Sequence, residues 1–442
     1  MNRGIAVAVW ILLGFVAVAA EPSAERGKDY LLGRNYNPPL FNRSAYDNLW
    51  KQWGLKDKPA PEDYDRLVRE RYGLHVAPYP NGGLPMGVRD GALAFGFGKG
   101  VSNDCMVCHG GSIAGKSYVG LGNASLDYQA WHEELSAADG KPRKSPFTFC
   151  NVRGTNEAGS MAVFLIGFRT PDLMLRRPRL DLDLQDDLCE DVPAWWLLKK
   201  KKTMYHTGGS DARSVRSIMQ FMMTPLNMPS DFTRAEEDFK DIRAYILSLE
   251  PPKYPLPIDR ELAKEGEALF TKTCARCHGT YGEKWTYPNK IVPIDEIGTD
   301  RRRYDGITKK FGDYYNQSWF AGDYKVTESA GYQAPPLDGV WATAPYFHNG
   351  SVPTVYHVLN SKARPKYFTR SYRTDLDVYD AEKLGWKVDV LPGPADATKL
   401  TPVEFRKVYD TTKSGRGNGG HTFGDRLSDK ERMAVIEYLK TL

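Results

Sequence analysis

Two stretches of the chain repeat apolar residues at helical spacing and have similar endings. In residues 233–249 the apolar side chains recur every three or four positions, at Phe239, Ile242, Ile246 and Leu249. Residues 428–442 begin with Ser428 and carry Glu431 three positions later, which is the spacing of a capping box. The repetition predicts two units, each closed by an amphipathic helix.

A proline-rich segment separates the two units. Residues 251–257 read Pro-Pro-Lys-Tyr-Pro-Leu-Pro, and proline lacks the N–H that a continuing helix needs, so this segment predicts a stiff linker. Further helices are expected near 60–72 and over 264–270. We therefore divide the chain into a signal peptide (1–20), an N-terminal arm (21–90), a first unit (91–250), a linker (251–263) and a second unit (264–442).

The N-terminus has the pattern of a secretory signal. Arg3 precedes an apolar run from Ile5 to Ala20, and the run ends in small residues followed by Glu21. Cleavage is expected near Ala19 or Ala20, with an uncleaved anchor as the alternative. The run is short for a membrane-spanning helix, so we expect a periplasmic or secreted protein without stable membrane insertion.

Composition adds few constraints on partners. The 442 residues suggest two or three domains, and the net charge of +5 gives no support to nucleic-acid binding. Basic residues gather at Lys199–Lys202 and Arg301–Arg303. Such clusters are usually solvated faces, with a docking patch for an acidic redox partner as the alternative.

The strongest chemical signal is a pentapeptide that occurs twice, Cys105-Met-Val-Cys108-His109 and Cys274-Ala-Arg-Cys277-His278. Two thiols three residues apart fall on one side of a helical turn, where they can form thioethers to haem vinyl groups while the histidine binds iron. A zinc site would have to join the two motifs across 169 residues and would leave both histidines unexplained. The sequence predicts two covalent haems c.

Two further cysteines, Cys150 and Cys189, remain outside these motifs. In an oxidising compartment they are expected to form a disulfide, and two buried free thiols are the alternative.

With haem attachment assigned, the helical pattern indicates a mainly α fold, a tandem of two cytochrome c-like domains with long inserted loops. Small cytochromes c carry the distal ligand on a loop just before the closing helix. In the second unit this loop contains His421 between glycines and Thr422, so His421 is the predicted second ligand of haem 2, ahead of His348 and His357.

The corresponding loop of the first unit is rich in methionine. Met228 before Pro229 is the analogue of an axial methionine, and Met222 and Met223 are weaker options. All three are also ordinary packing residues. If none of them binds iron, haem 1 is open on one side and can take O2 or peroxide.

Residues 341–354, which read WATAPYFHNGSVPT, resemble the signature of the dihaem cytochrome c peroxidase superfamily. Residues 287–293 (YPNKIVP), 298–300 (GTD) and the Gly420-His421 pair are most similar to its rubber-oxygenase-like branch. The resemblance covers roughly residues 91–442. It implies an N-terminal haem that meets the oxidant, a saturated C-terminal haem held by two histidines, and often a calcium ion between domains.

The chain departs from the classical peroxidases at their distal groups. No acidic residue occurs from Ala212 to Ser230, where a base for peroxide cleavage is expected. Glu157, His206 and Arg213 are the remaining candidates for catalytic groups, each with a structural role as the alternative. The position where those enzymes place an axial methionine is Lys362 here, which again favours His421.

Tryptophans are candidates for electron relay between the haems. Trp195 and Trp196 rank first because a similar segment in the rubber oxygenases lies by the first haem, and Trp285 and Trp341 follow. Core packing is the alternative for each.

These signals predict an exported dihaem oxidoreductase that uses O2 or peroxide at haem 1 and passes electrons through haem 2. A pure electron carrier, with Met228 closing haem 1, is the alternative. The expected partners are a small redox protein or a small-molecule oxidant.

Overall fold

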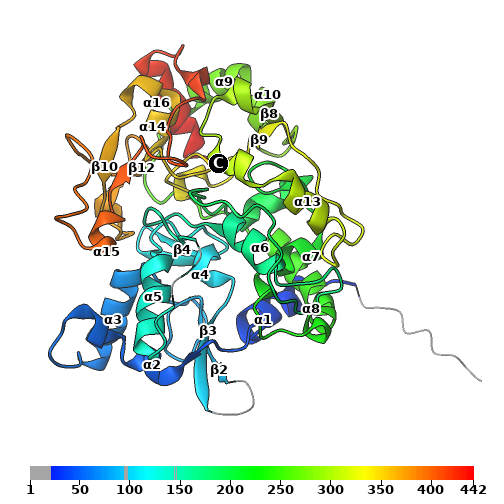
Figure 1. Ribbon diagram of the computed structural model, residues 1–442. Coiled ribbons are helices and arrows are strands. Elements are labelled where there is room, and N and C mark those ends of the chain that lie inside the picture. The colour runs from blue at the N-terminus through cyan, green and yellow to red at the C-terminus, as the bar shows by residue number, and fades with distance from the viewer. Residues whose placement is uncertain (1–20, 94–97, 144, 146) are drawn as a thin grey trace, which may run out of the picture.

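The computed structural model describes residues 21–93, 98–143, 145 and 147–442, so the predicted signal peptide lies outside the described residues. Helices and strands are interspersed along the chain (Figure 1). The helices are α1 (Ala24–Gly33), α2 (Arg43–Asp47), α3 (Pro61–Tyr72), α4 (Met106–His109), α5 (Tyr128–Ala138), α6 (Ala158–Ile166), α7 (Val215–Ile218), α8 (Pro229–Ser248), α9 (Arg260–Thr273), α10 (Ala275–His278), α11 (Ile294–Ile297), α12 (Arg302–Gly306), α13 (Lys309–Tyr315), α14 (Val355–Leu359), α15 (Pro402–Phe405) and α16 (Asp429–Leu439).

The strands form several small antiparallel sheets. β1 (Phe41–Asn42), β3 (Lys99–Asn103) and β2 (Val88–Ala92) make one sheet of three strands, and β13 (Asp389–Val390), β10 (Tyr367–Thr369) and β14 (Tyr409–Asp410) make another. The two-stranded sheets pair β4 (Gly110–Ile113) with β5 (Lys116–Val119), β6 (Thr203–Met204) with β7 (Ser210–Asp211), β8 (Ile291–Pro293) with β9 (Gly331–Gln333), and β11 (Tyr379–Asp380) with β12 (Gly385–Trp386).

This architecture corrects the predicted fold class. The structure is 38% helical with 12% strand and is a mixed α/β fold, and it shows no tandem cytochrome pattern. The prediction of a mainly α tandem of two cytochrome c-like domains is therefore wrong. Strands of two to five residues carry too little alternation of apolar and polar positions to be detected in the sequence.

The predicted helices near 60–72, 233–249, 264–270 and 428–442 are present as α3, α8, α9 and α16. The capping box at the start of α16 is confirmed, because Ser428 accepts from the Glu431 N–H and the Glu431 carboxylate accepts from the Ser428 N–H. Both closing helices pack against an earlier helix. Gly266 of α9 lies so close to α16 that a Cβ there would fall 1.9 Å from the Ala434 carbonyl oxygen.

The first closing helix is packed in the same way. Gly27 of α1 lies against the Asp241 carbonyl of α8, and Leu31 of α1 joins Phe239 and Ile242 of α8 in one apolar cluster. Figure 1 shows α1 and α8 side by side. The segment predicted as an arm therefore contributes a helix to the core, because an apolar face of α8 needs a partner to exclude water.

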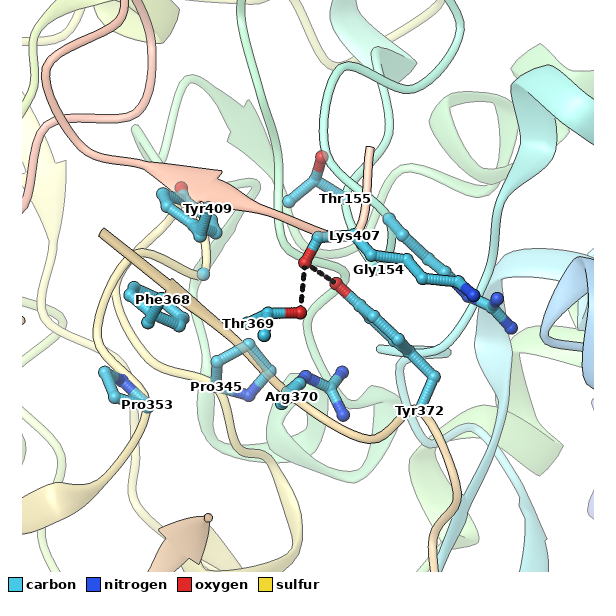
Figure 2. A pocket seen from close by; sticks show the side chains of 12 residues that line it. Gly154, Thr155, Pro345, Pro353, Phe368, Thr369, Arg370, Tyr372, Lys407 and Tyr409 are labelled. Atoms are coloured by element: carbon cyan, nitrogen blue, oxygen red, sulfur yellow. Dashed lines mark hydrogen bonds between the residues drawn. The ribbon is translucent and has the colours of Figure 1, made fainter. Parts of the chain in front are cut away.

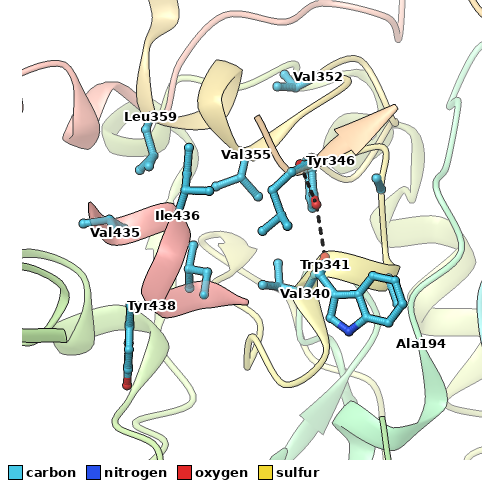
Figure 3. Close-up of a cluster of buried hydrophobic side chains, with 14 of the residues drawn as sticks. Ala194, Val340, Trp341, Tyr346, Val352, Val355, Leu359, Val435, Ile436 and Tyr438 are labelled. Atoms are coloured by element: carbon cyan, nitrogen blue, oxygen red, sulfur yellow. Dashed lines mark hydrogen bonds between the residues drawn. The ribbon is translucent and has the colours of Figure 1, made fainter. Parts of the chain in front are cut away.

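A second apolar cluster contains residues from both of the predicted units. Val435 and Ile436 of α16, Val355 of α14 and Trp341 gather in it (Figure 3), and Ala194 and Trp196 of the first unit belong to it as well. Within the part of the chain that the structure describes, none of the helices combines the length and the apolar character needed to cross a bilayer.

A small pocket also lies where the units meet. Gly154 and Thr155 line it together with Phe368, Thr369, Arg370 and Tyr372. The hydroxyls of Thr369 and Tyr372 both donate to the Lys407 carbonyl (Figure 2). None of the predicted haem or catalytic residues lines this pocket, so we do not assign the predicted chemistry to it.

Candidate functional site

The first Cys-x-x-Cys-His motif is anchored by a buried ion pair. Asp104, just before Cys105, accepts from the Met106 N–H at 2.7 Å and so holds the start of α4. Arg89 pairs with the Asp104 carboxylate and also donates to the carbonyls of Leu31 and Leu32 at the end of α1. These contacts tie the motif to the core.

The imidazole of His109 lies against an indole. Its ring centroid is 4.6 Å from that of Trp195, with the planes inclined by 26°. The backbone supports this arrangement, because Gly120 donates to the His109 carbonyl and Trp195 donates to the Gly120 carbonyl. Burial lowers the pKa of His109 to about 4, with the Pro193 carbonyl acting in the opposite direction. His109 is therefore neutral at pH 7, the form that binds a metal.

The second motif follows α9 directly and forms the short helix α10. The Nδ1–H of His278 donates to the Pro335 carbonyl at 2.8 Å. Because a carbonyl only accepts, the proton resides on Nδ1 and the lone pair on Nε2 is free. Burial also lowers the pKa of His278. A backbone carbonyl that holds the second ring nitrogen is the usual support of a metal-binding histidine.

His421 lies opposite His278. The two ring centroids are 6.3 Å apart, with the planes inclined by 58°. An imidazole–metal bond is about 2 Å long, so two rings that share one metal have centroids roughly 6 Å apart once the ring radii are added. The spacing of His278 and His421 therefore fits a pair of axial ligands to one haem iron.

The backbone of His421 is held in an unusual conformation. His421 has a φ of 46°, and its N–H donates to the Ile297 carbonyl at 2.7 Å. A Cβ at Gly420 would lie 2.2 Å from the carbonyl carbon of Gly298, so this position requires glycine. Burial lowers the pKa of His421 to about 4, and the neighbouring His278 acts in the same direction.

The two rival histidines are engaged elsewhere. His348 stacks on Tyr332, with ring centroids 4.1 Å apart, and its Nε2 lies 3.2 Å from the Tyr332 hydroxyl. The Nδ1 of His357 lies 2.7 Å from the Thr354 hydroxyl. These contacts give each ring a local partner.

All four motif cysteines are free and partly exposed, as attachment to a haem requires. Across the described ranges 21–93, 98–143, 145 and 147–442, no three His, Cys, Asp or Glu side chains converge as ligands of a metal ion. Neither a zinc site at the motifs nor the calcium ion implied by the family resemblance gains support from this arrangement.

The three methionines predicted near haem 1 are placed differently. Met228 is 51% exposed and precedes α8, where its N–H donates to the Asp231 carboxylate. Met222 and Met223 are buried in the apolar cluster against which Cys105 also packs. The structure thus brings Met222 and Met223, rather than Met228, into the cluster that contacts Cys105 of the first motif.

Two of the predicted catalytic residues have structural partners. The buried carboxylate of Glu157 accepts from the N–H groups of Leu188 and Cys189 at 2.7 and 2.9 Å, while burial raises its pKa to about 7. Arg213 is exposed and pairs with Asp211. Neither placement favours a role above a haem.

The other two candidates lie between the units. The Nε2–H of His206 donates to the Asp191 carbonyl at 2.8 Å, and burial lowers the pKa of His206 to about 4. The indole N–H of buried Trp196 donates to the Asp338 carbonyl at 2.8 Å. Trp196 therefore binds the same segment, residues 335–338, whose Pro335 carbonyl accepts the hydrogen bond from His278.

The expected disulfide is not formed. Cys150 and Cys189 are buried free thiols, and their sulfurs lie near the Val152 carbonyl and the Thr155 hydroxyl respectively. The alternative of two buried thiols therefore describes the structure.

Sequence analysis did not identify Pro335 and Arg364, which support His278 and the His421 loop. Both act on or through backbone carbonyls. Because every residue has a carbonyl, such contacts leave no pattern in side-chain type.

Comparison with known proteins finds a family whose model matches one segment of the chain. Residues 331–369 match the family described as RoxA-like, cytochrome c-like. This segment contains Pro335, His348 and Arg364 but neither Cys-x-x-Cys-His motif.

Two curated relatives come from Sinorhizobium fredii (strain NBRC 101917 / NGR234). Uncharacterized protein y4iM is 28% identical over 301 residues, which are 57% of this chain and 64% of the relative. Uncharacterized protein y4iJ is 31% identical over 263 residues, 44% of this chain and 41% of the relative. The alignments thus span less than two thirds of either relative. Together with the family match, the two motifs support a protein of the cytochrome c kind that carries covalently bound haem c.

Proposed function

We propose that this chain is an exported oxidoreductase with two covalent haems, related to the rubber-oxygenase-like branch of the dihaem peroxidase superfamily. The observation that carries the proposal is the placement of His421 opposite His278, 6.3 Å between ring centroids, beside a second complete Cys-x-x-Cys-His motif. The resemblance of residues 341–354 to that superfamily supports the same conclusion.

Each motif would hold one haem. Cys105 and Cys108 would form the thioethers of haem 1, with His109 as its axial ligand. Cys274 and Cys277 would attach haem 2 between His278 and His421. Haem c supplies a redox-active iron that transfers electrons when both axial positions are filled and binds O2 or peroxide when one is open.

The surrounding residues prepare both sites. Burial keeps His109, His278 and His421 unprotonated at neutral pH, so each offers a lone pair. The Pro335 carbonyl fixes the tautomer of His278, and Trp195 fixes the ring plane of His109.

The placement of Met228 supports an open distal side at haem 1. A half-exposed side chain at the start of α8 is poorly placed to bind a buried iron. We therefore propose that O2 or peroxide binds at haem 1 and that haem 2 exchanges electrons with a small redox protein in the periplasm or outside the cell.

A pure electron carrier is the second candidate. It is favoured by the burial of Met222 and Met223 in the cluster that includes Cys105. If either sulfur bound the iron of haem 1, both haems would be closed and no small ligand would bind.

Spectroscopy of the purified holoprotein distinguishes the two candidates. Haem content is measured after denaturation, and electron paramagnetic resonance and optical spectra are recorded before and after reduction under carbon monoxide. If the chain is an oxidoreductase with an open haem 1, the protein should contain two haems per chain, and one of them should bind carbon monoxide. Two low-spin haems that ignore carbon monoxide would favour the electron carrier, and a chain without covalent haem would refute both.

A further inference from the structure

Arg364 makes an unusually complete set of contacts to backbone carbonyls. It follows the short 3-10 helix η6 (Ser361–Ala363), which comes after α14. Its Nε–H donates to the His357 carbonyl at 2.8 Å and one Nη2–H to the Val358 carbonyl at 3.2 Å. These two bonds fix the guanidinium on the end of α14.

The remaining donors reach the loop that carries His421. Nη1 donates to the carbonyls of Asn418 and Gly420, both at 2.7 Å, and Nη2 donates to the carbonyl of His421 itself at 3.3 Å. A planar guanidinium with five donors can hold several acceptors in fixed directions, whereas an ammonium group cannot.

The loop keeps its shape through contacts with other segments. Besides Arg364, the side chains of Asn349 and Ser351 donate to the Gly417 carbonyl, and Asn418 donates to the Pro365 carbonyl. Residues 416–421 form neither helix nor strand, and three of them, Gly417, Gly419 and Gly420, are glycines. Glycine allows many backbone conformations, so an ordered glycine-rich loop needs outside contacts. On its other side the loop is held by the Asp300 carboxylate, which accepts from Gly417, and by the Ile297 carbonyl.

Arg364 also supports the side chain of His421 through an aromatic ring. Its guanidinium carbon lies 4.9 Å from the ring centroid of Phe347, and this ring lies 5.9 Å from that of His421. The arginine thus contacts both the backbone of His421 and a neighbour of its imidazole. Burial lowers the pKa of Arg364 to about 10, which leaves it charged at neutral pH.

We propose that Arg364 is a positioning residue that holds the imidazole of His421 opposite His278 and thereby keeps the second haem closed to external ligands. This proposal rests on the proposed function, in which His421 is an axial ligand. It adds that the strength of this ligation is set by a residue that does not touch the metal.

The test uses the full holoprotein with two substitutions. Arg364→Lys keeps the positive charge but loses the planar set of guanidinium N–H donors. Arg364→Met removes both the charge and the donors. Charge-assisted hydrogen bonds are strong, so we expect the equilibrium constant for displacing His421 by carbon monoxide to rise about tenfold in Arg364→Lys and roughly a hundredfold in Arg364→Met. The low-spin signal and the midpoint potential of the second haem should change in the same order, while the first haem keeps its signals.

Arg432 provides a matched control. It is also a buried arginine of the second unit, and it donates to the carbonyls of Leu359 and Asp425 and pairs with Asp429. None of these partners lies in residues 416–421. Arg432→Lys should lower stability without changing carbon monoxide binding or the potential of the second haem.

His421→Ala separates failure of this proposal from failure of the proposed function. If His421→Ala leaves both haems low-spin, His421 is not the ligand and both fail. If His421→Ala opens the second haem but a folded Arg364→Lys protein binds carbon monoxide as the wild type does, only the positioning role is overturned. Arg364→Lys decides the question if Arg364→Met does not fold.

Discussion

The indole of Trp195 stacks on the imidazole of His109, with their centroids 4.6 Å apart. Trp195 and Trp196 begin the 3-10 helix η3 (Trp195–Lys200), and the indole N–H of Trp196 donates to the Asp338 carbonyl. Asp338 lies three residues after Pro335, whose carbonyl holds His278. Two adjacent indoles therefore connect the histidine of one motif to the support of the other.

Replacing Trp195 by alanine should disturb the first haem selectively. The stack contributes about 1 kcal/mol beyond buried area, and its loss frees the His109 ring to rotate. We expect an altered low-field electron paramagnetic resonance signal and a shifted potential for haem 1 alone, with Trp195→Phe close to wild type. Trp285→Ala is the control, since Trp285 is half exposed and lies over Lys200. Equal effects of both substitutions would argue against a specific role of the stack.

Removing the thiols of one motif should halve the covalent haem. The double variants Cys105→Ala/Cys108→Ala and Cys274→Ala/Cys277→Ala should each retain one haem per chain, because each pair attaches its own haem. Haem and protein are quantified after denaturation, which releases any haem that is not covalently bound. Cys150→Ala should keep two haems. An unchanged haem content in either double variant would show that its motif does not attach haem.

The buried ion pair of Glu190 and Arg303 should make stability depend on acid pH. The Nε of Arg303 lies 2.9 Å from the Oε2 of Glu190, and both side chains are less than 10% exposed. Burial opposes ionisation of Glu190, but Arg303, His206 and the Gly159 N–H together outweigh it, and the pKa of Glu190 is lowered from 4.5. Because the folded pKa lies below the unfolded one, the stabilisation is present above about pH 4.5 and is lost as the pH falls through the folded value.

Glu190→Gln tests this dependence. At pH 7 it leaves Arg303 buried without its partner, which should cost about 3–5 kcal/mol, and the acid limb of the stability curve should become flatter. Chemical denaturation between pH 3 and 8 measures both effects. Asp313→Asn removes the exposed pair with Lys309 and should change stability little, because water screens exposed ion pairs. A wild-type curve as flat as that of Glu190→Gln would contradict the linkage.

The sequence predicted those parts of the molecule that depend on local side-chain pattern. The apolar spacing within residues 233–249 predicted α8, and the spacing of Ser428 and Glu431 predicted the capping box of α16. The small sheets were missed, since a strand such as Tyr367–Thr369 is too short to show alternation. His421 was singled out by its position before a helix, whereas Arg364 was not, because it contacts the His421 loop through backbone carbonyls that are distant in sequence.

Thiol titration should confirm that Cys150 and Cys189 are reduced. Four of the six cysteines are expected in thioethers, so the denatured and unreduced holoprotein should show two reactive thiols, and Cys150→Ala should show one. In the native protein both should react slowly, because burial raises the pKa of the Cys150 thiol well above its ordinary value and that of Cys189 to about 12, which leaves little thiolate. If no thiol reacts after denaturation and two react only after reduction, Cys150 and Cys189 form the disulfide that an oxidising compartment favours.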